Sequence, residues 1–447
     1  MAKVIDTKKS CAVYPLKLSQ PMGAAYCFLG IDKSMPIMHG SQGCAAFAKT
    51  FLTRHFREPI PMQTTALSEI ATVIGGDSNI HEAIKNVIDK NNPNVVGLVS
   101  TGVSETRGDD IIGSLKRFKS NFPDYADKKI VYVSTPDYLG SFETGYEKAL
   151  LEVVKALVEP PRRKYRDKVN IFVSYALTAG DIEEIKDMLK DFELDAVVVP
   201  DFSRSIGLMS DFSPITIGGT TLEEIQNLAS SSFSIAIGYS SKAAAEYLEK
   251  EYNVPMFYFE SLLGLKSTDE FYELLIKLTG REPSDKYKRY RSRLLDTMAD
   301  GQFYFSGKSV ALGLGPDLLT SLVLFLKEEL GLNIECAVSP VHTPNLDLLP
   351  IDTVYIGDLE DIKLNAKHVD MIISNTNGQH IAKHFKVPLL RIGIPIFDRV
   401  GHFFRTYVGY KGTLEFLCEL TNLFLEHDEE KSYEVPEFAK QMKEEIL

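Results

Sequence analysis

The stretch Val95-Val-Gly-Leu-Val-Ser-Thr101 is a continuous, mainly β-branched apolar run that ends in two hydroxyl-bearing residues. A second run of this kind, Ile130 to Thr135, follows later in the chain. Such runs are typical of strands buried on both faces of a parallel sheet. Ligands in these folds bind beyond the carboxyl ends of the strands, so residues 102–110 and 136–143 are candidate site loops.

The alternation of apolar strands and amphipathic helices recurs in two further blocks. A helix is predicted to open at Asp181, with Ile182, Ile185 and Leu189 on one face, and another over 316–330 with proline at its start. Charged residues 284–298 also indicate a helix, and further strands are predicted over residues 169–174, 196–199, 233–238, 309–314, 333–338, 353–356, 371–374 and 389–392. The pattern therefore predicts an α/β protein with three Rossmann-like domains, each a parallel sheet flanked by helices.

The length of 447 residues also favours three domains, because a single core seldom grows beyond about 250–300 residues. The basic, proline-containing stretch Glu159 to Lys168 indicates a linker. We expect an N-terminal domain over 1–160, a second domain over 161–300 and a third over 301–447. The first would carry the partner interface and the one cysteine discussed below.

Composition excludes several classes of protein. The hydrophobic and charged contents, 44% and 25%, are those of an ordinary globular chain. A net charge of −12 argues against a general nucleic-acid-binding surface. No apolar run approaches the roughly 18 residues of a membrane span, and the N-terminus lacks an apolar targeting segment. We therefore expect a cytoplasmic protein with neither nucleic acid nor membrane as its partner.

The five cysteines do not form the even, clustered pattern of a secreted disulfide framework. Cys27, Cys336 and Cys418 lie in apolar strand-like or helix-like runs, which predicts small buried side chains. Cys11 has no informative neighbours. Only Cys44 has surroundings that indicate chemistry.

Cys44 closes the stretch His39-Gly-Ser-Gln-Gly-Cys44, in which the glycines predict a flexible turn able to wrap around a bulky group. Thiolate sulfur favours copper(I), zinc or iron–sulfur clusters. A single thiol completes no such site, because structural zinc and iron–sulfur clusters usually take four protein ligands. Either other residues supply the remaining ligands, or Cys44 binds no metal.

The charged residues that follow this stretch, Arg54, Arg57 and Glu58, have two interpretations. Cations near a thiolate-bound cluster would tune its potential, whereas the same residues could equally form an ion-paired helix end. The sequence leaves both open.

Other motifs are weaker. Gly313-Leu-Gly315 sits between a strand and a helix, but the next residue is proline, so a tight turn is favoured over a dinucleotide loop. His39 or His55 could activate Cys44 as a nucleophile, although no triad signature surrounds the cysteine. His380 and His384 could share a helix face, where packing is favoured over zinc.

Three motifs are specific enough to compare with known families: Ser19-Gln-Pro-Met-Gly-Ala24; the Cys44 stretch followed by Arg54-His-Phe-Arg-Glu-Pro59; and Ser100-Thr-Gly-Val-Ser-Glu-Thr-Arg-Gly-Asp-Asp110. They resemble the β-type subunits of the nitrogenase component 1 family. Residues 357–361, 374–378, 395–401 and 410–412 extend the resemblance over essentially the whole chain.

The resemblance also separates two kinds of β-type subunit. The catalytic subunit of the family binds its eight-iron P-cluster with three cysteines, whose positions correspond to Ser19, Cys44 and Gly102 here. With Cys44 alone remaining, the chain resembles the subunit of the cofactor-assembly scaffold. This implies one [4Fe–4S] cluster, used in electron transfer, with Cys44 as its metal ligand beside Ser41 and Gly43, and with the other three cysteines on the partner.

The family also implies partners. They are a NifE-like subunit in an α2β2 heterotetramer, NifB as precursor donor, the iron protein NifH as source of electrons, molybdenum and homocitrate, and apo-nitrogenase as acceptor. The iron–molybdenum cofactor precursor would reside mainly on the NifE-like subunit, and the chain would have no turnover of its own. Ile74 corresponds to an apolar contact for the iron protein.

Two alternatives stand beside this interpretation. The first is the β-type subunit of a vanadium-type scaffold or of a related nitrogenase-like reductase. The second is a metal-free, three-domain module that binds a small ligand between its domains.

Overall fold

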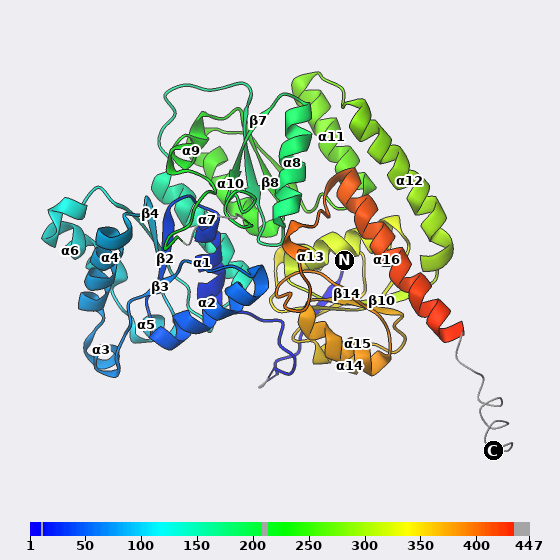
Figure 1. Ribbon diagram of the computed structural model, residues 1–447, viewed down its shortest axis with the longest axis horizontal. Helices are drawn as coiled ribbons and strands as arrows, with labels where there is room; N and C mark the ends of the chain where they lie inside the picture. The colour runs from blue at the N-terminus through cyan, green and yellow to red at the C-terminus, as the bar shows by residue number, and fades with distance from the viewer. Residues whose placement is uncertain (10–11, 208–212, 433–447) are drawn as a thin grey trace, which may run out of the picture.

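The computed structural model describes residues 1–9, 12–207 and 213–432. Three sheets, each wholly parallel, are flanked by helices and form three lobes (Figure 1). The α/β class with three parallel sheets is therefore confirmed. The domain limits at residues 160 and 300 stay predictions.

The first sheet has the strand order β3-β2-β4-β5. Its strands are β2 (Ser34–Met38), β3 (Gln63–Thr64), β4 (Val95–Val99) and β5 (Lys129–Val133). The β4 strand is buried at every position, as its apolar run predicts. The helices in the lobe of this sheet are α1 (Gln20–Leu29), α2 (Gln42–Phe56), α3 (Glu69–Ile74), α4 (Asp77–Asn91), α5 (Gly102–Arg107), α6 (Ile111–Asn121) and α7 (Phe142–Leu157), with a short 3₁₀ turn over Pro123–Tyr125.

Helix α1 is buried at all ten positions and crosses α7 at very short range. A side chain on Gly23 would strike the carbonyl oxygen of Phe142, and one on Gly145 would strike that of Gln20. Two glycines thus let the two backbones meet. This packing explains the glycine of the Ser19–Ala24 motif.

The second sheet has the order β7-β6-β8-β9. Its strands are β6 (Lys168–Val173), β7 (Asp195–Val199), β8 (Phe233–Ile237) and β9 (Met256–Phe259). The helix predicted to open at Asp181 begins at Ala179, because Thr178 caps it and Asp181 closes the capping box. The helices are α8 (Ala179–Asp191), α9 (Leu222–Gln226), α10 (Tyr239–Tyr252), α11 (Leu265–Thr279) and α12 (Asp285–Phe305), with a 3₁₀ turn over Leu228–Ser230.

The third sheet has the order β1-β12-β11-β10-β13-β14. Its strands are β1 (Lys3–Asp6), β10 (Ser309–Gly313), β11 (Asn333–Ser339), β12 (Thr353–Ile356), β13 (Met371–Ser374) and β14 (Leu389–Arg391). The helix predicted over 316–330 is α-helical only to Val323 and continues as a π-helical segment over Leu324–Glu329. This helix is α13 (Pro316–Val323). The other helices are α14 (Glu360–Asn365), α15 (Gln379–Phe385) and α16 (Gly409–Ser432), with 3₁₀ turns over Pro344–Leu348, Thr376–Gly378 and His402–Phe404.

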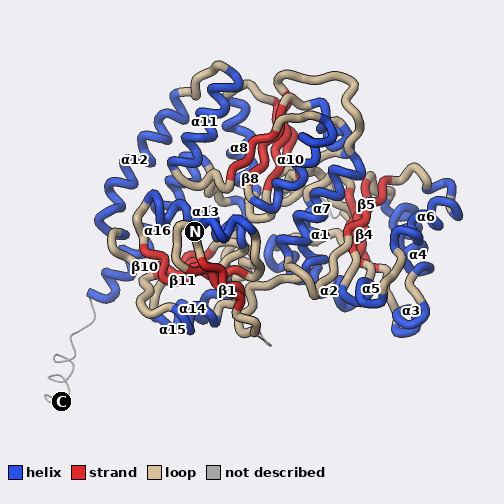
Figure 2. The backbone as a smooth tube through the Cα atoms, turned by 180° about the vertical axis from the view of Figure 1, so that it is seen from behind, coloured by secondary structure: helices blue, strands red, loops and turns tan. Residues whose placement is uncertain are grey.

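The chain's first strand lies far in sequence from the sheet that it joins. Seen from behind, β1 lies in the lobe of β10 and β11, although it precedes the whole first sheet in sequence (Figure 2). Lys3 to Asp6 pair in register with Thr353 to Ile356 of β12. The N-terminus therefore ties the first block of sequence to the last.

The cysteine predictions have different outcomes. Cys27 on α1 and Cys336 on β11 are buried, as predicted. The prediction for Cys418 is wrong: on α16 its neighbours Phe416 and Leu417 face the core, whereas Cys418 turns outward and is exposed. Cys11 lies outside the described residues.

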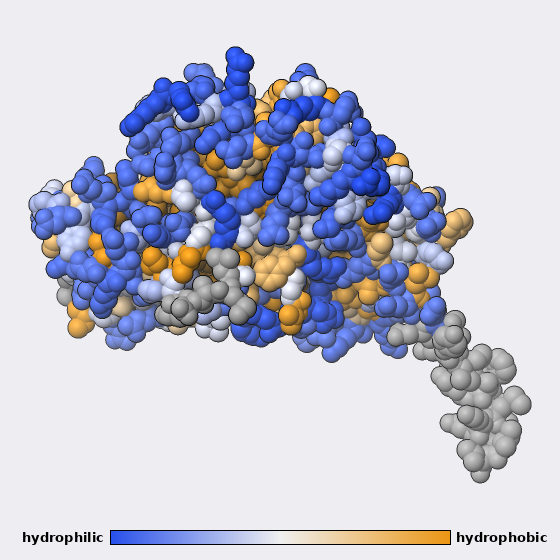
Figure 3. Space-filling model, turned by 45° about the horizontal axis from the view of Figure 1, so that its top comes forward, coloured by the Kyte–Doolittle hydropathy of each residue, from blue (hydrophilic) through white to orange (hydrophobic). Residues whose placement is uncertain are grey.

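The surface is mainly hydrophilic. On the face in Figure 3, hydrophobic side chains form separate patches among hydrophilic ones. Among the described helices, none combines the length and apolar character that a bilayer span requires.

Candidate functional site

Cys44 lies in the first turn of α2 and is exposed. Ser41 is the N-cap residue, and its hydroxyl donates to Cys44 Sγ at 3.3 Å. The expected glycine turn is wrong, because Gly43 is part of α2 and neither Gly40 nor Gly43 has positive φ. This placement puts the Cys44 sulfur at the positive end of the α2 dipole.

Gly40 serves close packing instead of flexibility. A Cβ atom on Gly40 would lie 2.8 Å from Thr101 Oγ1, which donates to the carbonyl oxygen of His39 at 2.8 Å. The absence of a side chain lets the end of β2 rest against the residue that follows β4. The Cys44 segment is thereby held at the carboxyl edge of the first sheet.

Cys44 opens onto a hollow of about 740 Å³. Ser19 and Gly102, the positions of the other two cysteines in the catalytic subunit, line the same hollow. Both predicted site segments reach it. The first was predicted as a loop, but its lining residues Gly102, Val103, Thr106 and Arg107 lie on helix α5, whereas the second contributes Asp137 and Tyr138. The remaining lining residues are Pro21, Met38, Thr72 and Thr101.

The donors of this hollow do not complete a metal site. Among the described residues that line it, Cys44 is the only thiol, since serine and glycine stand at positions 19 and 102. Within the described part of the chain, no group of three or more His, Cys, Asp or Glu side chains could hold a metal ion. The described residues of the hollow therefore offer one soft ligand, the Cys44 sulfur.

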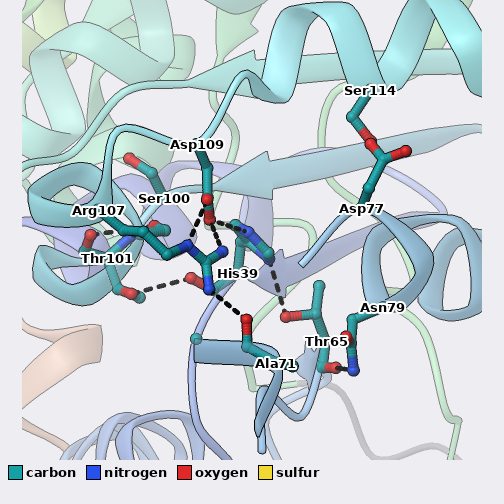
Figure 4. Close-up of polar contacts among 12 residues, drawn as sticks. His39, Thr65, Ala71, Asp77, Asn79, Ser100, Thr101, Arg107, Asp109 and Ser114 are labelled. Atoms are coloured by element: carbon teal, nitrogen blue, oxygen red, sulfur yellow. Dashed lines mark hydrogen bonds and ion pairs between the residues drawn. The ribbon is translucent and has the colours of Figure 1, made fainter. Parts of the chain in front are cut away.

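Arg107, which lines the hollow, belongs to a polar network with His39 and Asp109 (Figure 4). His39 Nε2 donates to Asp109 Oδ2 at 3.0 Å, and His39 Nδ1 accepts from Thr65 Oγ1 at 2.9 Å. Asp109 also forms a two-pronged ion pair with Arg107, whose Nη1 donates to the carbonyl oxygen of Ala71 at 2.6 Å. Burial lowers the pKa of His39 despite the neighbouring carboxylate, which keeps the ring neutral near pH 7.

No local pattern in the sequence predicts this network, because its members come from four separate places in the chain: His39, Thr65, Ala71 and the segment with Arg107 and Asp109. The sequence offers only one signal, the carboxylate pair Asp109-Asp110 in a loop after a buried strand.

The cations after Cys44 belong to a different site. Arg54 and Arg57 lie ten or more residues further along α2, so they are about 15 Å or more away at 1.5 Å per residue. Arg54 stacks over the Phe397 ring, and Arg57 donates to the carbonyl oxygen of Phe397 at 2.8 Å. Glu58 accepts from the backbone of Gly207 at 2.7 Å. These contacts support a structural role for the three residues at the end of α2 and not the tuning of a cluster at Cys44.

The histidines do not form a nucleophilic pair with Cys44. Both ring nitrogens of His39 are engaged by Thr65 and Asp109. His55 is buried at the far end of α2 against His402. His380 stacks on Tyr14, and His384 packs on Phe385.

Known proteins similar to this chain identify its family. Residues 19–425 match the family described as "Nitrogenase component 1 type Oxidoreductase". The protein "Nitrogenase iron-molybdenum cofactor biosynthesis protein NifN" of Nostoc sp. is 42% identical over 431 residues, covering 96% of this chain and 97% of that one. The chain belongs to the NifN group of the nitrogenase component 1 family. The NifN of Klebsiella pneumoniae is 37% identical over 433 residues, covering 95% and 94%.

A solved structure agrees with this placement. The chain resembles one from "Nitrogenase Cp1 at pH 6.5" with a TM-score of 0.88 at 32% identity, covering 96% of both chains. A chain from "Nitrogenase Cp1 at pH 5" has a TM-score of 0.72 at 16% identity, which supports the fold alone. The family resemblance inferred from the three motifs is thus confirmed. Ile74 lies in α3, but its side chain is outside the described set.

Proposed function

We propose that this chain is the NifN-type subunit of a scaffold on which the iron–molybdenum cofactor precursor matures before transfer to apo-nitrogenase. In this proposal Cys44 is one ligand of a [4Fe–4S] cluster shared with a NifE-like partner, which supplies three cysteines. The chain acts without independent turnover, and the shared cluster transfers electrons to the maturing cofactor.

One observation carries the proposal: Cys44 is a lone exposed thiol in the same open hollow as Ser19 and Gly102. A cluster held by this chain alone would need more thiolates than the hollow contains. A cluster shared across an interface needs one thiol on an open surface, and Cys44 has that position. Ser41 and Gly43 form the adjoining helix start and would lie beside the cluster.

Apolar side chains at and next to the hollow support a covering partner. Val103 and Tyr138 line it and are 44% and 60% exposed, and Leu139, beside Tyr138, is 57% exposed. Phe47, one turn beyond Cys44 on α2, is 70% exposed. Exposed aromatic and aliphatic groups around a polar centre are typical of a protein–protein interface. We therefore place the NifE-like subunit over this surface, in an α2β2 heterotetramer.

The other partners follow from the NifN group. NifB donates the precursor, which resides mainly on the NifE-like subunit. The iron protein NifH delivers electrons, molybdenum and homocitrate, and apo-nitrogenase receives the finished cofactor. These exchanges take place in the cytoplasm.

The test is cluster content in the complex. The chain is expressed anaerobically with its NifE-like partner and without NifB, so that the precursor contributes no iron. We expect about four irons per heterodimer and an EPR signal of a reduced [4Fe–4S] cluster. Cys44→Ala removes both, because it deletes the chain's only ligand in the hollow.

Cys418→Ala is the matched control, since Cys418 is also exposed but lies on α16 outside the hollow. It should keep the iron and the signal. Full iron and an unchanged EPR signal in Cys44→Ala would show that the cluster is bound elsewhere.

A further inference from the structure

Arg107 connects the Cys44 hollow to helix α3. It lines the hollow together with Cys44 and Thr72. The same guanidinium donates through Nη1 to the carbonyl oxygen of Ala71, within α3, at 2.6 Å. One cation therefore faces the site of the cluster and holds a neighbouring surface helix.

Asp109 fixes the direction of that guanidinium. Its carboxylate receives both Nε and Nη2 of Arg107 and, on the same side, the ring of His39. His39 is buried completely and lies two residues before the N-cap of α2. A charge-assisted, two-pronged pair anchored on a buried ring holds a side chain in one orientation.

Close packing restricts the network further. A Cβ atom on Gly76, just beyond α3, would lie 2.7 Å from His39 Cε1 and 2.9 Å from Arg107 Nη2. The backbone after α3 thus rests directly on the ring and the guanidinium. Helix α3 therefore cannot shift towards the network without displacing the His39 ring and the Arg107 guanidinium.

Helix α3 is short and lies at the surface. It has six residues, and Ile70 and Val73 are exposed. Its Ser68 cap bonds to Ala71 N at 3.1 Å and is itself exposed. The hydrogen bond from Arg107 to Ala71 joins this helix to α5.

We propose that Arg107 is a positioning residue that couples the order of α3 to the electrostatic surroundings of the cluster at Cys44. Arg107 lines the hollow and Asp109 does not, so the positive end of this ion pair faces the cluster and favours its reduced form. When α3 moves, the guanidinium loses its bond to the carbonyl oxygen of Ala71, which together with Asp109 sets its place beside the cluster, and the cluster potential changes. This inference rests on the proposed function only for the presence of the cluster.

Two variants separate the effect of the Arg107 charge from that of its hydrogen bond to Ala71. Amide exchange and the cluster midpoint potential are measured in the complex with the NifE-like partner. Arg107→Met removes both the charge and the hydrogen bond, so amide exchange in α3 should accelerate about tenfold, the loss expected for one charge-assisted hydrogen bond. The cluster midpoint potential should become more negative. Arg107→Lys keeps the charge but not the two-pronged geometry, so exchange accelerates while the potential stays closer to wild type.

Arg117→Met is the matched control. Arg117 lies on the neighbouring helix α6 and pairs with Asp77, outside the hollow. It should leave α3 exchange and the potential unchanged. Wild-type α3 exchange in Arg107→Met, or an unchanged potential in that variant with its iron retained, would overturn the proposal. Exchange is also measured in iron-free Cys44→Ala, where Arg107→Met should still accelerate it, so a failed cluster assignment is recognised separately.

Discussion

Glu143 is a carboxylate inside the protein, at the first turn of α7. Burial raises its pKa from 4.5 to about 7, although the hydroxyl of Ser141 donates to it and opposes the shift. Between these two pH values the folded chain binds one proton more at this position than the unfolded chain. Stability from this group is therefore complete below pH 4.5 and is lost as the pH rises towards 7 and above.

Replacing Glu143 with glutamine should remove that loss. Across the pH range from 5 to 7, the stability of Glu143→Gln relative to wild type should rise by about 1.4 kcal/mol per pH unit, about 3 kcal/mol in all. Urea unfolding at several pH values measures this difference. Glu152→Gln, at a partly exposed position of the same helix, is the control and should follow wild type. Parallel curves for Glu143→Gln and wild type would contradict the assigned shift.

At the scale of the element, α2 connects two regions with different tasks. Its first turn presents Cys44, and its last turn packs into the loop before α16. There His55 accepts the backbone N–H of Ile396 at 3.0 Å and contacts His402. Burial lowers the pKa of His402 to about 4, so the two rings stay neutral near pH 7 and pack without charge repulsion.

His55→Ala should destabilise the protein by about 2–4 kcal/mol, because it opens a cavity and leaves the N–H of Ile396 without an acceptor. A lowered midpoint of thermal unfolding measures the effect. Arg399→Ala changes an exposed residue of the same loop and should shift the midpoint little. An equal shift in both variants would contradict a specific role for the His55 contact.

At the scale of the whole molecule, the N-terminal strand closes the architecture. Beyond β1, Lys9 pairs with Asp358 at 2.8 Å and with Asp361 at 3.0 Å. These carboxylates raise the pKa of Lys9 despite its partial burial, which lowers it. The largest buried apolar cluster contains residues of all three sheets.

Deleting residues 2–9 should loosen the third sheet selectively. The β12 strand would lose a neighbour along its whole length and become an edge. Hydrogen exchange should rise in β12 and α14 and remain slow in β4, which serves as the internal control. A uniform rise over all three sheets would show that β1 supports the whole core instead.

Much of the fold could be predicted because its signals are local. The apolar runs that became β4, β6, β8 and β10 need only their own residues to indicate buried strands. The β2 strand was not predicted, because Pro36 lies at its centre and proline argues against a paired strand. The short strands β1, β3 and β9 were missed because their assignment depends on partners far away in sequence.

By itself, the sequence determined the parallel α/β class and the family, because composition, the length of apolar runs and motif spacing are properties of the chain alone. It also showed that Ser19 and Gly102 stand where the catalytic subunit has cysteines, which leaves Cys44 alone. Only the tertiary structure decided that Cys44 starts a helix, that Ser19 and Gly102 share its hollow, and that Arg107 joins the hollow to α3. It also separated Arg54 and Arg57 from the thiol. The reason is physical: a site is made of contacts between segments, and the free energy that selects them comes from packing the whole chain.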